Sequence, residues 1–123
     1  MCLGSNPSPA ATIFRRVAPK LTDNEVLKLV KDRLSERFDV KRIILFGSRA
    51  TGKASLESDY DVLVVADTDI PFVKRQGLAL LDLGARDFAI DLLVFTPSEA
   101  EEEARMLGSA VYWAEREGKE YVA

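Results

Sequence analysis

The sequence predicts an α/β (α+β) domain, with a small mixed β-sheet of three or more strands and helices packed on it. Three short runs rich in apolar and β-branched residues predict buried strands at residues 41–46, 60–66 and 88–95. Helix-periodic segments separate these runs, as expected for a domain in which helices cover a sheet. No apolar run approaches the ~20 residues that a membrane-spanning helix needs.

The first helix is predicted over residues 22–38. Thr22 and Glu25 have the spacing of a capping box, in which each side chain accepts a hydrogen bond from the other residue's backbone N–H. The apolar residues that follow recur at helical spacing and predict one buried face, made of Val26, Leu27, Val30, Leu34 and Phe38.

Three further helices are predicted after the second strand. One spans about residues 71–84 and is weakened in its middle by Gly77. Another begins at Pro97, with acidic residues in its first turns that suit the helix dipole. The last covers about 109–117, and Gly118 is predicted to be the residue that ends it.

The chain divides into an N-terminal extension, residues 1–20, and one domain, residues 21–123. The extension holds three of the five prolines and has little periodicity, which predicts a loosely ordered segment. The N-terminus lacks the apolar stretch of a secretory signal. Cys2 is the single cysteine, which excludes an internal disulfide and favours a reducing, cytoplasmic location.

The composition narrows the chemistry further, because the chain contains no histidine. Histidine-dependent nucleophiles, histidine general bases and histidine-bound zinc are therefore excluded. The net charge is −3, made of +5 over residues 1–58 and −8 over residues 59–123. A weakly acidic chain is not expected to have nucleic acid as its main partner.

Three aspartates are the candidate catalytic and metal-binding residues. Asp59 and Asp61 stand directly before and within the second strand, and residues two apart in a strand point to the same face. Asp91 lies in the apolar third strand, where a buried acid needs a cation. If these strands are neighbours, the three carboxylates converge and favour Mg²⁺ or Mn²⁺. Asp87 is a competing third acid, and each acid alone could instead be a turn cap or a salt-bridge partner.

A glycine loop adds a candidate phosphate site. Gly47 and Ser48 come directly after the first strand, where a sharp turn presents backbone N–H groups and a hydroxyl that suit phosphate oxygens. Arg49 and Lys53 are close enough in sequence to add positive charge. A Gly-Ser pair alone is a common turn, but together with the carboxylates it favours a site for a metal and a nucleotide.

The spacing from Gly47-Ser48 through ten residues to Asp59-Tyr60-Asp61 resembles the signature of the DNA polymerase β-like nucleotidyltransferase superfamily. The surrounding "FGSRATGKASLESDYDVLVV" is similar to its minimal nucleotidyltransferase branch, and the resemblance runs from about residue 22 to 121. Two positions depart from the pattern: Thr51 stands where arginine is frequent, and Val62 replaces a common leucine.

The resemblance implies a small cytoplasmic, Mg²⁺-dependent enzyme that transfers AMP from ATP to a protein hydroxyl, with a tyrosine of a HEPN-type ribonuclease toxin as the expected acceptor. Gly47 and Ser48 would bind the triphosphate, Asp59 and Asp61 two metal ions, and Asp91 the catalytic metal and the incoming hydroxyl. A toxin partner, or a second copy of the chain, would complete the site. The alternatives are an antitoxin that acts only by binding and transfer to a small-molecule hydroxyl.

Overall fold

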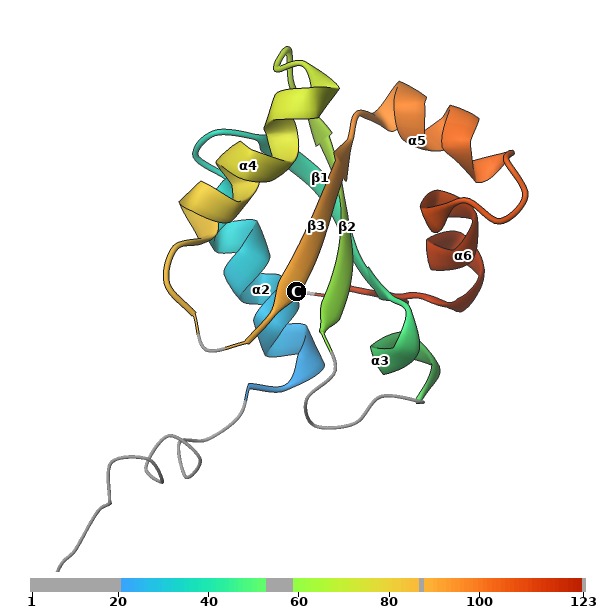
Figure 1. Cartoon of the computed structure of the whole chain (residues 1–123), viewed down its shortest axis with the longest axis horizontal. Helices are drawn as coiled ribbons and strands as arrows, with labels where there is room; N and C mark the ends of the chain where they lie inside the picture. Colours follow the sequence, from blue (N-terminus) through green and yellow to red (C-terminus); the bar gives the residue numbers. More distant parts are fainter. Residues whose placement is uncertain (1–20, 53–58, 87, 123) are drawn as a thin grey trace, which may run out of the picture.

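A four-stranded mixed sheet forms the centre of the molecule in the computed structural model, which describes residues 21–52, 59–86 and 88–122. The strand order is β3-β2-β1-β4. The strands are β1 (Asp39–Phe46), β2 (Tyr60–Asp67), β3 (Ile90–Phe95) and β4 (Lys119–Glu120). Figure 1 shows helices on both sides of the sheet, so the predicted α/β class with a mixed sheet is confirmed.

The two central pairings have opposite directions. β1 pairs with β2 antiparallel, and β2 pairs with β3 parallel, so that Asp61 stands opposite Asp91. The expectation that the second and third strands are neighbours is therefore confirmed. The parallel connection passes through α4 (Phe72–Leu83), as parallel neighbours require a crossover.

The first face of the sheet is covered by α2 (Asp23–Leu34) and α4, which lie on the same side in Figure 1. The capping box of Thr22 and Glu25 is present at the start of α2. One continuous apolar core fills the space between helices and sheet; it includes Val26, Leu27, Val30, Leu34, Phe38, Ile43, Leu45, Val62, Val64, Ala79, Leu83, Leu92 and Val94.

The second face is covered by α5 (Pro97–Ala104) and α6 (Ala110–Glu117), on the opposite side in Figure 1. A smaller apolar cluster lies beneath them, formed by Ile44, Leu63, Val65, Ala100, Val111 and Ala114. The start of α5 is capped by Thr96 and Glu99 in a second capping box. Arg42 on β1 pairs with both Glu115 of α6 and Glu120 of β4, which fastens this layer to the sheet edge.

One buried arginine joins the far end of the sheet to both helical layers. Arg75 of α4 donates to the carbonyl oxygens of Ile70 (2.7 Å) and Val94 (3.2 Å) and to the carboxylate of Glu99 (2.6 Å to Oε1). These contacts satisfy a guanidinium whose side chain is only 6% exposed. The pKa of Glu99 is lowered, first by its hydrogen bond with Arg75.

Several sequence-based boundaries are corrected by the structure. The first helix ends at Leu34 rather than residue 38, because Ser35 caps it and Phe38 enters the core from the following turn. Gly118 ends α6 as predicted, but with a φ of −78° rather than the left-handed conformation of many terminating glycines. Glycine is required there because a Cβ would lie 2.5 Å from Ile44 Cγ2.

Two predicted features lie outside the described residues: the extension 1–20 and the charged loop residue Lys53. Asp87, the competing third acid, is also outside them. Within the described ranges, no helix has the length and apolar character needed to cross a membrane.

Candidate active site

The site lies at the end of the sheet where β2 and β3 begin and β1 ends. Asp61 and Asp91 are directly opposite each other in the parallel register, and Asp61 also stands opposite Phe46 of β1. Asp59 precedes β2 by one residue. The alternation of side chains places Asp61 and Asp91 on the second face, the face that α5 and α6 cover further along.

The expected burial of Asp91 is wrong. Asp91 is exposed, although its sequence neighbours Ile90 and Leu92 are buried. β3 is an edge strand, and its first residues on the second face extend beyond the helices that cover its end. Asp61 is half-buried and Asp59 is exposed, so all three carboxylates are accessible to a ligand from solvent.

Gly47 brings the loop after β1 into direct contact with Asp61. Its φ of +76° lies in the left-handed region that glycine adopts without strain. A Cβ on Gly47 would collide with Oδ2 of Asp61 and lie 3.3 Å from its Cγ. The glycine is therefore required both by the turn and by the close approach of the carboxylate. Ser48 follows as the first residue of α3 (Ser48–Thr51).

The electrostatics of the site centre on Asp61. Burial raises the pKa of its carboxyl, and the negative charges of Asp91 and Asp59 raise that pKa further. Asp91, from the neighbouring strand, and Asp59, from the loop before β2, are therefore the negative charges that act on Asp61. A cation among these groups would offset their mutual repulsion.

These residues fit a divalent cation that takes only part of its ligands from protein. The donors are all carboxylate oxygens, which suit Mg²⁺ or Mn²⁺. Within the described ranges, however, no three acidic or cysteine side chains are grouped closely enough to hold a metal ion by themselves. Mg²⁺ commonly keeps water and takes phosphate oxygens from its substrate together with one or two carboxylates.

Arg49 lies beside the site but contacts an aromatic ring. Its guanidinium carbon is 4.0 Å from the ring centroid of Tyr60, which also makes an edge-on contact with Phe88 at 5.2 Å. Neither Tyr60 nor Phe88 was predicted from the sequence to take part in the site. The sequence did contain a signal for the position of Tyr60. It lies between two aspartates, so the alternation of a strand turns its ring to the first face, away from Asp61.

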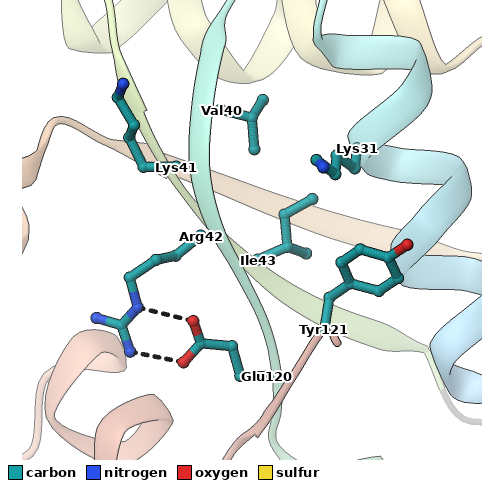
Figure 2. A pocket seen from close by; sticks show the side chains of 7 residues that line it. All are labelled: Lys31, Val40, Lys41, Arg42, Ile43, Glu120 and Tyr121. Atoms are coloured by element: carbon teal, nitrogen blue, oxygen red, sulfur yellow. Dashed lines mark hydrogen bonds and ion pairs between the residues drawn. The ribbon is translucent and has the colours of Figure 1, made fainter. Parts of the chain in front are cut away.

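A hollow of about 190 Å³ lies elsewhere, at the open edge of β1 (Figure 2). Its walls come from α2, β1 and the chain end, namely Lys31, Val40, Lys41, Arg42, Ile43, Glu120 and Tyr121. Figure 2 shows the paired Arg42 and Glu120 on one side and Tyr121 and Lys31 on the other. None of the candidate carboxylates lines it, so it is separate from the site at Gly47.

A family model and several known proteins are similar to this chain. The family model described as "Nucleotidyltransferase domain" matches residues 27–86, just under half of the chain, and includes Gly47, Ser48, Asp59 and Asp61. This part of the chain is therefore similar to a nucleotidyltransferase domain.

Three known proteins are similar to it. A curated protein of Methanocaldococcus jannaschii, named "Putative protein adenylyltransferase MJ0604", is 53% identical over 34 residues, which are 28% of this chain and 34% of that protein. A crystal structure of a toxin-antitoxin with AMP-PNP matches with a TM-score of 0.51 and 26% identity, over 81% of this chain and 72% of the other. A mutant of the toxin-antitoxin MntA-HpeT matches with a TM-score of 0.50 and 25% identity, over 85% and 74%.

The curated match thus spans about a third of that relative's length. The family model, the fold and these relatives agree in their similarity to nucleotidyltransferases.

Proposed function

We propose that this protein transfers AMP from ATP to a hydroxyl group of a toxin partner, with a tyrosine of a HEPN-type ribonuclease as the acceptor. The observation that carries the proposal is the contact of Gly47 with Asp61, which stands opposite Asp91 on the neighbouring strand. This arrangement puts a turn suited to phosphate beside two carboxylates. The names of the similar proteins, an adenylyltransferase and toxin-antitoxin complexes, support the same substrate and partner.

In the proposed reaction, Gly47 and Ser48 bind the β- and γ-phosphates through backbone N–H groups and the serine hydroxyl. Arg49 and Lys53 add positive charge near the triphosphate. The acceptor oxygen attacks the α-phosphorus, and a new P–O bond forms as the bond from the α-phosphorus to the bridging oxygen breaks. Pyrophosphate leaves with the electron pair of that bond.

The proton of the acceptor hydroxyl passes to the carboxylate of Asp91. Its exposure suits this role, because a group on a second protein can reach it. Asp59 and Asp61, with Asp91, would hold Mg²⁺, which supplies positive charge to the phosphate oxygens when it is bound. The pKa of Asp61 is raised first by burial and then by the charges of Asp91 and Asp59, and a cation would offset the repulsion between these acids.

Two ATP preparations test the transfer. We expect label at the α-phosphate to appear on the toxin in the presence of Mg²⁺, and label at the γ-phosphate to remain in solution as pyrophosphate. Toxin labelled from the γ-phosphate would instead mean phosphorylation and would refute the proposal. The absence of any label on a toxin that is nonetheless inhibited would favour an antitoxin that acts by binding.

The metal requirement is tested separately by calorimetry of ATP binding. We expect binding with Mg²⁺ or Mn²⁺ and a large loss of affinity with a chelator, because the aspartates would otherwise repel the triphosphate. Equal affinities in both conditions would contradict the proposed metal site.

A further inference from the structure

The carboxylates are reached from the same face of the sheet that carries α5 and α6. Along β2, Leu63 and Val65 are buried beneath these helices, whereas Asp61 is only half-buried. Along β3, Asp91 is exposed. The helical layer therefore stops short of the acids. An acceptor that presents a hydroxyl to Asp91 approaches next to the outer surface of this layer.

The layer formed by α5 and α6 exposes large apolar and aromatic side chains. Met106 and Leu107, in the turn between α5 and α6, are 52% and 83% exposed, and Trp113 of α6 is 45% exposed. α6 packs on the core through Val111 and Ala114. The side chain of Trp113 is therefore not needed to hold this helix in place.

The aromatic residues of α6 form an ordered group. Tyr112 and Trp113 make an edge-on contact with centroids 5.2 Å apart, and the guanidinium of Arg116 lies 4.4 Å from the Tyr112 centroid. Trp, Tyr and Arg are the residues most enriched among those that dominate binding energy in protein interfaces. Met is also enriched there. We call Met106, Leu107, Tyr112, Trp113 and Arg116 the α6 surface.

The charge around the α6 surface indicates the chemistry of its partner. Residues 97–117 contain six glutamates and two arginines, a net charge of −4. Glu101, Glu102 and Glu117 are exposed and form no ion pair within the part of the chain that the structure describes. An apolar centre with an acidic rim is complementary to an apolar patch with a basic rim.

We propose that the α6 surface is the docking surface for the acceptor protein, and that the acceptor contacts it with a basic surface around an apolar centre. This inference rests on the proposed function. A ribonuclease has the required chemistry, because it must carry positive charge to bind the phosphates of RNA. Docking on the α6 surface would put such a protein on the same face of the sheet as Asp61 and Asp91.

The test uses the full chain and the full-length HEPN-type ribonuclease toxin of the proposed function. We expect Trp113→Ala to weaken binding of the unmodified toxin by at least about tenfold. It should raise the KM for the toxin while leaving kcat at saturation and calorimetric Mg²⁺–ATP binding unchanged. The double variant Glu101→Lys, Glu102→Lys should slow association and reduce its dependence on salt.

The matched control is Val73→Ala, because Val73 is an equally apolar and 86% exposed side chain on the other side of the sheet, on α4. It should leave binding unchanged. Unchanged binding by Trp113→Ala, or equal losses in both variants, would overturn the docking surface. A dimer of the chain alone that Trp113→Ala dissociates would also overturn it, in favour of a second copy as the occupant.

The outcomes separate the two proposals. A toxin that binds through Trp113 but gains no AMP supports the docking surface and refutes the transfer. A toxin that wild type and Trp113→Ala modify at equal rates when its concentration is below the wild-type KM supports the transfer and refutes the docking surface. If the wild-type chain neither binds nor modifies the toxin, both proposals fail.

Discussion

The two faces of the sheet differ in how completely they are covered. On the first face, the core under α2 and α4 continues along β2 from Val62 to Ala66 without a polar side chain. On the second face, the apolar cluster under α5 and α6 is smaller, and acidic residues occupy the sheet where that cluster ends. Burial on the first face supplies stability. The incomplete cover of the second face leaves the carboxylates accessible, and the proposed chemistry depends on that access.

The largest effect is expected from neutralising the acids of the second face. Asp61→Asn or Asp91→Asn should lower transfer by about a thousandfold or more while the fold is retained, because the first removes a proposed ligand of the cation and the second removes the proposed proton acceptor. Asp67→Asn is the matched control, since Asp67 is an exposed acid at the other end of β2. Steady-state kinetics measure the effect, and more than a tenth of wild-type activity in either site variant would count against the assignment.

A smaller but still large effect is expected from Gly47→Ala. The methyl group would collide with Asp61 and the left-handed φ would strain the loop, so transfer should fall by about a hundredfold. Stability should fall by about 1–2 kcal/mol. The control is Gly77→Ala in α4, where a Cβ meets nothing within 4 Å and should stabilise the helix by about 0.5–1 kcal/mol. Denaturation and kinetics on both variants distinguish strain at the site from a general effect of replacing glycine; an active Gly47→Ala protein would contradict the contact.

Arg75→Met should affect stability rather than catalysis. It removes the donor to the carbonyl of Val94 and leaves Glu99 with the backbone N–H of Thr96 but no cation, at the end of the sheet remote from the acids. We expect the free energy of unfolding to fall by about 3 kcal/mol. This is the lower end of the range for breaking a buried ion pair, because the side chain of Glu99 is partly exposed. Urea denaturation measures the loss. Transfer per folded molecule should be unchanged, and a selective loss of activity would show coupling between the two ends.

The smallest expected effect is on the pH dependence of stability. The pKa of Asp61 is raised in the folded protein, mainly by burial, so the folded state binds this proton more tightly than the unfolded chain. The ionised carboxylate is therefore destabilising above the raised pKa, and the penalty disappears as pH falls below the unfolded value. Without metal, Asp61→Asn should have a slightly higher Tm than wild type at pH 7 and an equal Tm in acid. A lower Tm at pH 7 would mean that the carboxylate is structural.

The sequence predicted the central strands and the neighbouring positions of the second and third strands well. β2 was recognisable because its apolar run from Val62 to Ala66 is uninterrupted, and the period of two puts Asp61 on the same face as Leu63 and Val65. The capping box of Thr22 was visible because both of its partners are local. The contact between Gly47 and Asp61 was not predictable, because it joins two strands through a pairing that the sequence does not specify.

Features that depend on distant contacts were missed. β4 has only two residues, both polar, and is a strand because they pair with Ile44 and Leu45 of β1. Arg75 is buried because its partners come from other elements, including Glu99, which is 24 residues away. Asp91 was expected to be buried because its flanks are apolar, but an edge strand can expose one residue between two buried ones.

The most direct test of the account is the intact mass of the toxin after co-expression with this protein, followed by its ribonuclease activity once the two are separated. We predict that the toxin carries one or more AMP groups on hydroxyl residues and stays inactive after separation. Asp91→Ala should abolish the added mass and restore the ribonuclease while the complex still forms. An inhibited toxin without added AMP, inhibited equally by the Asp91→Ala protein, would contradict nucleotidyl transfer.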